Sequence, residues 1–454
     1  MAPQPSGPVD ITDAPPPPTV TRPGSINDQQ YLIDCYLEYG PVFRVLQKGE
    51  LARKEGDEFT VLAGPEANAF AMRTTNMHQG TDSAVKLRSD SHWEDFSNEL
   101  GMDGFSREGD MHRQHRMLTS RGYARTTITG RLPEVVAMAE AVTARWEPGQ
   151  RVPAVREIQR IVGEQLGRSL IGFSPAEYVD DLVTFVRTTK LTMLLRTGAA
   201  EMLADPAYER ARNRVFEIGY RAINARLAIP PDERPGDLLD DMLAVFHPKL
   251  GDDLPPLLVA ATIGPFLAGL ETASYRTAYL LHLILNHEDV ARRVVEEVDD
   301  WFAGPPTWDR LKTCRALYGG MMEALRLYKG PARQWYTAEE SFVFENHLVA
   351  KGDSVIIVYD TSHHLPELFP DPGAFDVDRY RAPRNEHRRL GAFAPFGVGG
   401  HTCLGSGMAE VQVMVNVATI LRDWELDALG LPFDADADAD EAMRVGVVAR
   451  RPAR

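Results

Sequence analysis

The chain has 454 residues, of which 44% are apolar and 25% charged, and its formal net charge at pH 7 is −16. This composition is that of an ordinary globular protein, and the excess of acidic residues argues against nonspecific binding to nucleic acid. The three cysteines, Cys35, Cys314 and Cys403, show no Cys-x-x-Cys spacing. They therefore argue against a disulfide scaffold, a zinc cluster or an iron–sulfur site, and favour a cytoplasmic location.

The first 26 residues are polar and rich in proline, with consecutive prolines at positions 15–18. They contain no apolar core, so we interpret residues 1–26 as a disordered tail rather than a signal peptide or a membrane anchor. The longest uncharged apolar run, 254–270, is shorter than the roughly 20 residues that span a bilayer. We therefore expect no membrane anchor, and one large domain over residues 27–454.

Short strands are expected near both ends of this domain, with helices between them. From residue 107 to about residue 328 the apolar residues recur almost throughout with the period of a helix. An irregular polar stretch, 77–106, precedes this region, and a loop of that length is usually functional or mobile. The pattern predicts a mainly α fold with small β-sheets. The predicted strands are 42–46, 58–62, 342–344, 355–358 and 443–449.

Two helices of the long helical region carry candidate polar sites. His112 and Arg116 are four residues apart and therefore share a helical face; a solvated basic face is the alternative. The helix opened by Pro255-Pro256 contains Ala268-Gly269-Leu270-Glu271-Thr272, in which the Thr272 hydroxyl can donate to the Ala268 carbonyl and open a small polar groove. Pro265 is expected to kink this helix one turn earlier.

Glu271 is an acid in an otherwise uncharged helix. A buried carboxylate is unfavourable without a task or a partner, which points to a function. The alternative is that Glu271 begins the solvated end of the helix.

A later helix pairs Glu323 with Arg326 at a spacing of three residues. The same spacing occurs at several other places, including Glu386 and Arg389, most of which we interpret as surface pairs. The pair His363-His364 could suggest a metal site, but without neighbouring carboxylates or cysteines we interpret it as structural. A basic cluster precedes Cys403 and either steers an acidic partner or forms a solvated loop. Its members are Arg379, Arg381, Arg384, Arg388 and Arg389.

The cysteine loop reads Phe396-Gly397-Val398-Gly399-Gly400-His401-Thr402-Cys403-Leu404-Gly405. It is too rich in glycine for a helix or strand, and a helix over 408–421 follows directly. Backbone N–H groups and a helix N-terminus favour a thiolate at Cys403, which suits a metal ligand. A buried free cysteine is the alternative. A dinucleotide loop is excluded because Thr402 stands where a third glycine is required.

The pattern Phe-Gly-x-Gly-x-His-x-Cys-x-Gly resembles the haem-ligand loop of the cytochrome P450 superfamily, the haem-thiolate monooxygenases. The resemblance implies that Cys403 ligates the iron of haem b and that Phe396 packs beside the sulfur. It implies further that Gly397 and Gly405 admit close backbone approach and that His401 contacts a haem propionate.

The resemblance extends over nearly all of residues 30–449 and implies the cytochrome P450 fold of a soluble, bacterial-type member. Ala268 to Thr272 resembles the oxygen-activation motif, in which Ala268 adjoins the cofactor while Glu271 and Thr272 deliver protons. His112 and Arg116 resemble the propionate-binding pair of the family. Arg333 is a further propionate candidate, although its spacing departs from the common bacterial pattern. Finally, Glu323, Arg326 and Arg379 would form the structural triad beneath the cysteine loop.

The resemblance implies a monooxygenase that inserts one oxygen atom from O2 into a C–H or C=C bond of an apolar small molecule. Two electrons would come from NAD(P)H through a ferredoxin reductase and ferredoxin, or a flavodoxin-type donor, as separate proteins. One alternative is a peroxide-driven peroxygenase or an isomerase-type relative, which generally lacks the acid–alcohol pair Glu271-Thr272. A second is a non-catalytic haem protein for gas sensing or electron transfer, which needs no oxygen-activation helix.

Overall fold

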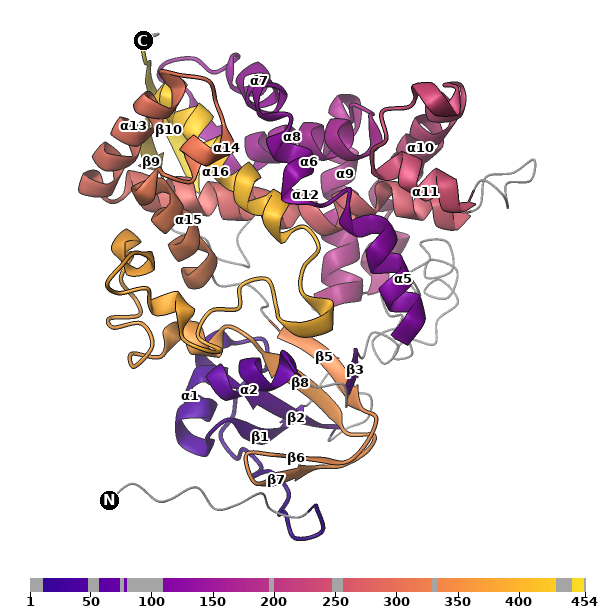
Figure 1. The fold of residues 1–454 in the computed structure, drawn as a ribbon, viewed down its shortest axis with the longest axis vertical. Helices are drawn as coiled ribbons and strands as arrows, with labels where there is room; N and C mark the ends of the chain where they lie inside the picture. The colour runs from indigo at the N-terminus through magenta and orange to yellow at the C-terminus, as the bar shows by residue number, and fades with distance from the viewer. Residues whose placement is uncertain are drawn as a thin grey trace.

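The computed structural model describes residues 11–47, 57–73, 77–79, 109–195, 200–246, 256–328, 333–429 and 443–452. The helices gather at one end of the molecule and the largest β-sheet lies at the other, with the cysteine loop between them (Figure 1). The predicted class, mainly α with small β-sheets, is confirmed. Most of the predicted 77–106 loop lies outside the described residues.

The helical part contains most of the described helices, and α1 and α2 lie against the large sheet (Figure 1). Two π-helical turns, Gly167–Ile171 and Lys190–Leu195, extend α8 and α9. The helices are α1 (Gln29–Tyr39), α2 (Gly64–Ala71), α5 (Gly109–Ser120), α6 (Arg125–Thr129), α7 (Leu132–Thr143), α8 (Ala154–Leu166), α9 (Val179–Thr189), α10 (Pro206–Leu227), α11 (Leu238–Phe246), α12 (Pro256–Leu285), α13 (Glu288–Phe302), α14 (Trp308–Leu311), α15 (Arg315–Leu327) and α16 (Ser406–Asp423).

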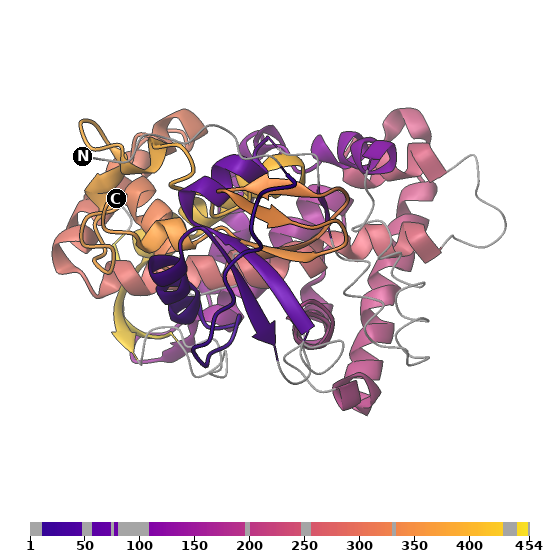
Figure 2. The same ribbon diagram turned by 90° about the horizontal axis from the view of Figure 1, so that it is seen from below.

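The strands of the described residues form three sheets, of which the largest has five strands in the order β1-β2-β8-β5-β3. In that sheet β2 and β8 pair in parallel, and the other neighbours pair antiparallel. Seen from below, this sheet lies in front of the helices (Figure 2). The strands are β1 (Val42–Gln47), β2 (Asp57–Ala63), β3 (Met77–Gln79), β4 (Arg151–Pro153), β5 (Arg333–Ala338), β6 (Phe342–Phe344), β7 (His347–Val349), β8 (Ser354–Val358), β9 (Trp424–Leu429) and β10 (Arg444–Arg450).

Helix α12 is the centre of the helical part. It has 30 residues and packs against α8, α9, α10, α15 and α16, because apolar side chains project from most of its circumference. It begins at Pro256, and proline is favourable there because the first N–H groups of a helix have no acceptor within the helix. The helix continues through Pro265 to Leu285, so the expected kink does not interrupt it. No helix of the described residues is long and apolar enough to cross a membrane.

The predicted disordered tail does not hold for residues 14–26. Val20 and Ile26 are buried in the cluster beneath the large sheet. The Val20 N–H donates to the Arg44 carbonyl at 2.8 Å, and the Pro15 carbonyl accepts from Leu348 N–H at 2.8 Å. Prolines lack a donor but keep their acceptor, so a proline-rich segment can still line the edge of a sheet.

Alternation along β5 decides which of its side chains face the cysteine loop. Tyr336 belongs to the apolar cluster that contains Ala394 and Val398 of the loop region. Trp335, the next residue along, packs in the cluster that contains Ile26. Because successive side chains of a strand point to opposite faces, Arg333 lies on the Trp335 face, away from the cysteine loop.

Candidate functional site

The cysteine loop is held by left-handed glycines and backbone hydrogen bonds. Gly397 and Gly399 have φ values of 68° and 75°, which favour glycine. A side chain at Gly399 would place its Cβ 2.4 Å from the Ala71 carbonyl oxygen of α2. The Cys403 N–H donates to the Phe396 carbonyl at 2.9 Å. The loop therefore brings the backbones of Phe396 and Cys403 together just before α16.

The Cys403 sulfur lies at the N-terminal end of α16, which begins at Ser406. The residue is accessible, yet enough protein surrounds it that burial raises the pKa of its thiol. Backbone N–H groups of Gly405 and Ser406, together with the charge of Arg116, act in the opposite direction on this pKa. Such a thiol lines an internal space, and a metal cation there would displace its proton.

Arg116 reaches this space from α5. Burial lowers the pKa of the half-buried Arg116 guanidinium, and the thiol of Cys403 opposes that shift, so the two groups lie near each other. His112 is on the same helix one turn earlier, but its side chain lies outside the described residues. Tyr123, which the sequence analysis missed, is also close enough to Cys403 for the sulfur to raise the pKa of its phenol, after burial.

Helix α12 presents an uncovered stripe in the middle of the molecule. Ala268 and Thr272 are exposed, whereas Leu270, Glu271 and Ala273 are buried. The Thr272 hydroxyl donates to the Ala268 carbonyl at 2.9 Å, so the hydrogen bond expected from the sequence is present. Since α12 packs against several helices along its length, these exposed residues border an opening in the interior.

Glu271 has a partner that the sequence did not suggest. Its carboxylate is 5% exposed and lies 2.7 Å from the ammonium of Lys190, at the start of the π-helical turn that follows α9. The same ammonium lies 5.9 Å from the centre of the Tyr275 ring. Glu271 is therefore a buried, paired acid rather than the solvated end of a helix. The separation of 81 residues left no local signal for this pair.

Glu323, Arg326 and Arg379 meet beneath the cysteine loop, as the sequence analysis expected. The Glu323 carboxylate lies 2.6 Å from the Arg326 Nε and 3.4 Å from the Arg379 Nε, and all three side chains are at most 1% exposed. Arg326 also donates to the carbonyls of His363 and Pro372. The arginines thereby tie the helix α15 to the coil that leads into the loop.

Two further members of this network were missed. Tyr380 donates to Glu323 at 2.6 Å, and Glu386 accepts from Arg379 at 3.0 Å. Glu386 is 4% exposed, so its interpretation as part of a surface pair with Arg389 was wrong. His363, interpreted as structural, is buried and accepts from the Ala394 N–H at 2.9 Å. No cluster of three or more His, Cys, Asp or Glu side chains within the described ranges could hold a metal.

Arg333 does not lie where a propionate contact was expected. Its guanidinium donates to the carbonyl of Ile26 and to the side chain of Asn27, on the N-terminal side of the sheet. On the loop side Tyr336 lies instead, with its ring centre 6.5 Å from that of His401. Because β5 was not predicted as a strand, the alternation that turns Arg333 away could not be anticipated.

The basic cluster before Cys403 is largely neutralised. Arg379 is buried, Arg381 pairs with Asp378 at 3.2 Å, and Arg384 pairs with both Asp376 and Glu386 at 2.6 Å. Arg388 and Arg389 are exposed. The surface therefore carries less free positive charge than the sequence suggested.

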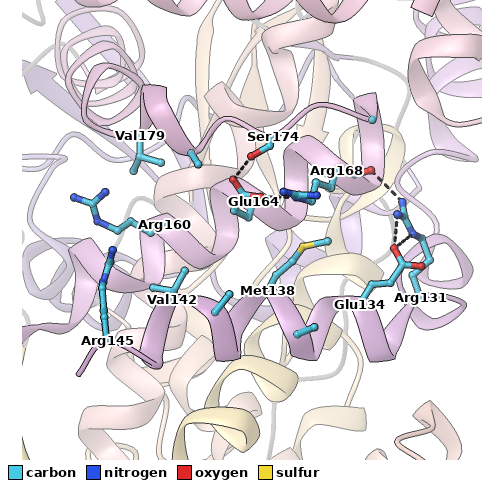
Figure 3. Close-up of a pocket in the computed structure, with 14 residues that line it drawn as sticks. Arg131, Glu134, Met138, Val142, Arg145, Arg160, Glu164, Arg168, Ser174 and Val179 are labelled. Atoms are coloured by element: carbon cyan, nitrogen blue, oxygen red, sulfur yellow. Dashed lines mark hydrogen bonds and ion pairs between the residues drawn. The ribbon is translucent and has the colours of Figure 1, made fainter. Parts of the chain in front are cut away.

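A groove between α7 and α8 has a volume of about 670 Å³ (Figure 3). Met138 and Val142 form part of its apolar floor, and its rim contains Arg131 hydrogen-bonded to Glu134 and Arg168 hydrogen-bonded to Glu164. None of the site residues predicted from the sequence lines it. The groove is thus separate from the space at Cys403.

The residues around Cys403 fit a haem held by a thiolate. They supply an accessible thiol, backbone N–H groups at a helix N-terminus and a neighbouring arginine. A Cβ added at Gly405 would lie 3.9 Å from the Cys403 sulfur, so the backbone passes close to it.

Comparisons with known proteins agree with this geometry. The sequence profile of the cytochrome P450 family matches residues 177–450. The chain is 29% identical to cyclooctat-9-en-7-ol 5-monooxygenase of Streptomyces melanosporofaciens over 328 residues, which cover 70% of this chain and 71% of that protein. It is 24% identical to the sterol 14alpha-demethylase of Mycolicibacterium vanbaalenii over 411 residues, covering 87% and 86%.

Solved structures show the same fold. The retinoic acid-bound cyanobacterial CYP120A1 superposes with a TM-score of 0.77 at 20% identity, covering 97% of this chain and all of that one. The haem domain of cytochrome P450DA gives a TM-score of 0.74 at 20% identity, covering 97% and 99%. The chain belongs to the cytochrome P450 family and is a haem b-dependent monooxygenase.

Proposed function

We propose that this monooxygenase inserts one oxygen atom from O2 into a C–H or C=C bond of an apolar small molecule. In this proposal two electrons come from NAD(P)H through a separate ferredoxin reductase and ferredoxin, or through a flavodoxin-type donor. The observation that carries the proposal is the accessible Cys403 thiol in front of α16, inside a fold whose central helix exposes Ala268 and Thr272. The names of the relatives specify cyclooctat-9-en-7-ol and a sterol, which supports an apolar substrate.

The haem would be held by residues from separate elements. Cys403 would ligate the iron, Phe396 would pack beside the sulfur, and Arg116 and His401, with His112, would bind the carboxylates of the group. When bound, haem with a thiolate ligand supplies the chemistry that cleaves the O–O bond. The pairing of Arg116 with an anionic group is supported by its position near Cys403.

Protons would be supplied from α12. The Thr272 hydroxyl holds its proton against the Ala268 carbonyl at 2.9 Å and can rotate to present it to the interior opening. Glu271 is the neighbouring acid, buried and held 2.7 Å from the ammonium of Lys190. Thr272 would donate the proton at the opening, and the Lys190–Glu271 pair behind it would return a proton to the hydroxyl, because proton transfer needs groups within hydrogen-bond reach or one water apart.

Spectroscopy of the purified holoprotein tests the proposal. The reduced carbonyl complex of the wild type should show the strongly red-shifted Soret band of thiolate ligation, and Cys403→Ala should lose it. Product should form with NAD(P)H, a ferredoxin reductase and ferredoxin. Turnover with peroxide alone would favour a peroxygenase, and nitrogen ligation of the iron would refute the assignment of Cys403. We also propose a reducing cytoplasm as the location, supported by the three free thiols.

A further inference from the structure

Arg276 lies on the uncovered stripe of α12. It follows Ala268 and Thr272 at intervals of four residues, so the three side chains share a face, with Cβ atoms of neighbours roughly 6 Å apart. Arg276 is half-buried, whereas the flanking Thr277 and Ala278 are buried. A guanidinium therefore stands one helical turn beyond Thr272, along the same interior opening.

The Arg276 guanidinium lies over an aromatic ring and has no carboxylate partner among the described residues. Its carbon lies 3.5 Å from the centre of the Tyr328 ring, at the C-terminal end of α15, as in a cation–π contact. Within the described part of the chain Arg276 takes part in no ion pair. The carboxylate whose charge acts on it is that of Asp360, whose Oδ2 accepts from the Gln29 side chain at 2.5 Å.

Among the described residues, the fully buried arginines are paired with acids, and the half-buried Arg333 donates instead to a carbonyl and to an amide side chain. Arg326 contacts Glu323, and Arg226 contacts both Asp237 and Asp240 at 2.6 Å. Removing a guanidinium from water without a counter-charge is unfavourable, and burial accordingly lowers the pKa of Arg276. An unpaired cation that borders an interior opening is a position where an anion would bind strongly.

We propose that Arg276 binds the carboxylate of the substrate, which would make the substrate class an apolar molecule with an acidic end. This inference rests on the proposed function, because it assumes that the interior opening receives the substrate. A planar guanidinium fixed by stacking matches the two oxygens of a carboxylate. The haem also has carboxylates, but the candidates for those are Arg116 on α5 and His401 on the cysteine loop. Arg276 projects from the oxygen helix beside Thr272, which places it toward the substrate.

The test compares matched acids and alcohols as ligands of the holoprotein. Straight-chain C8–C16 carboxylates and the corresponding primary alcohols would be titrated by spin-state difference spectra and by calorimetry at pH 7.5. The wild type should bind the acid about 10- to 100-fold more tightly than the alcohol at the best chain length, as expected for a charge-assisted hydrogen bond. Arg276→Met should reduce this preference to about twofold or less, and Arg276→Lys should keep part of it.

A second variant distinguishes binding from a purely structural role. Asp360→Asn removes a carboxylate whose charge acts on Arg276 without pairing with it, so it should increase the acid preference. A wild type without acid preference at any chain length, including one that binds none of the acids, would overturn the proposal. So would an unchanged preference in Arg276→Met.

The cofactor and the substrate are separated by measuring haem release to apomyoglobin. Faster release from Arg276→Met, with no loss of acid preference, would assign Arg276 to a haem carboxylate and overturn the substrate assignment. The inference and the proposed function fail in different ways. A missing thiolate spectrum refutes the function, whereas a normal thiolate spectrum with no acid preference refutes only the role of Arg276.

Discussion

Replacement of Glu323 by Gln should destabilise the protein far more than loss of an ordinary helix ion pair. The Glu323 carboxylate accepts two hydrogen bonds from Arg326, at 2.6 and 2.9 Å, one from Tyr380 at 2.6 Å and one from the Asp376 N–H at 3.0 Å. Arg379 lies within 3.4 Å. Glutamine has nearly the same shape as glutamate, but it leaves the buried guanidinium groups of Arg326 and Arg379 without its negative charge. Its amide NH2 would also replace a carboxylate oxygen that accepts hydrogen bonds, so two donors would face each other.

The expected magnitude follows from burial. Removing one partner of a buried ion pair costs about 3–5 kcal/mol, because the other charge remains inside without compensation. The matched control is Asp309→Asn, which breaks a pair with Lys312 at the same spacing, 2.6 Å apart but with side chains 83% and 50% exposed. An exposed pair of that kind contributes about 0.2–1 kcal/mol.

The assay is urea denaturation of both holoproteins, followed by far-ultraviolet circular dichroism and by the Soret band. Glu323→Gln should lower the free energy of unfolding by several kcal/mol and lose the haem signal at lower urea than the wild type, because the coil under Cys403 is released. A loss no larger than that of Asp309→Asn would refute the reasoning that the network, rather than packing of α15, holds this coil.

Three further predictions concern the proton supply and one buried histidine. Thr272→Ala should uncouple NAD(P)H oxidation from product, whereas Thr272→Ser should stay coupled; equal coupling in both variants would remove the hydroxyl from the mechanism. Lys190→Met leaves the Glu271 carboxylate buried without a cation, so product per NAD(P)H should fall about 10-fold. Lys190→Arg should retain most of the product, and an unchanged ratio of product to NAD(P)H in Lys190→Met would contradict this reasoning. Burial holds the pKa of His363 well below its usual value, and its Nε2 must stay unprotonated to accept from Ala394. The stability that it contributes is complete above about pH 6.5 and is lost as the pH falls toward its folded-state pKa, by at most about 1.4 kcal/mol per pH unit. Unfolding at pH 7.5, 6.5 and 5.5 should therefore show a shallower acid loss for His363→Gln, and parallel slopes would exclude the effect.

Contacts that repeat within a few residues could be predicted from the sequence, and long-range partners could not. The i, i+4 bond between Thr272 and Ala268 follows from helix geometry alone, and the structure contains it. The glycines at 397 and 399 likewise predicted a turn, and both have positive φ in the structure. The partner of Glu271, in contrast, comes from a π-helical turn 81 residues earlier, which no periodicity in α12 encodes.

Arg333 shows how one missed strand changes a site. Because β5 was not predicted, Arg333 was judged only by its position in the chain, which made it a candidate for binding a haem propionate. As the first residue of a strand paired with Val358, it shares a face with Trp335 and donates to the N-terminal segment. That segment was predicted to be disordered because it is polar, rich in proline and without an apolar core, so its contact with Arg333 could not be anticipated either. Both depend on edge pairing of the sheet, which is a tertiary property.

Glu271 and Thr272 are neighbours in α12, but their side chains leave the helix in different directions. Successive side chains of a helix are about 100° apart, so Glu271 and Thr272 cannot face the same surroundings. Thr272 lies on the uncovered stripe, and Glu271 is turned into the protein toward Lys190 on the neighbouring element. Placed one residue earlier, the acid is buried and paired with Lys190, while the Thr272 hydroxyl is the group that meets the interior opening.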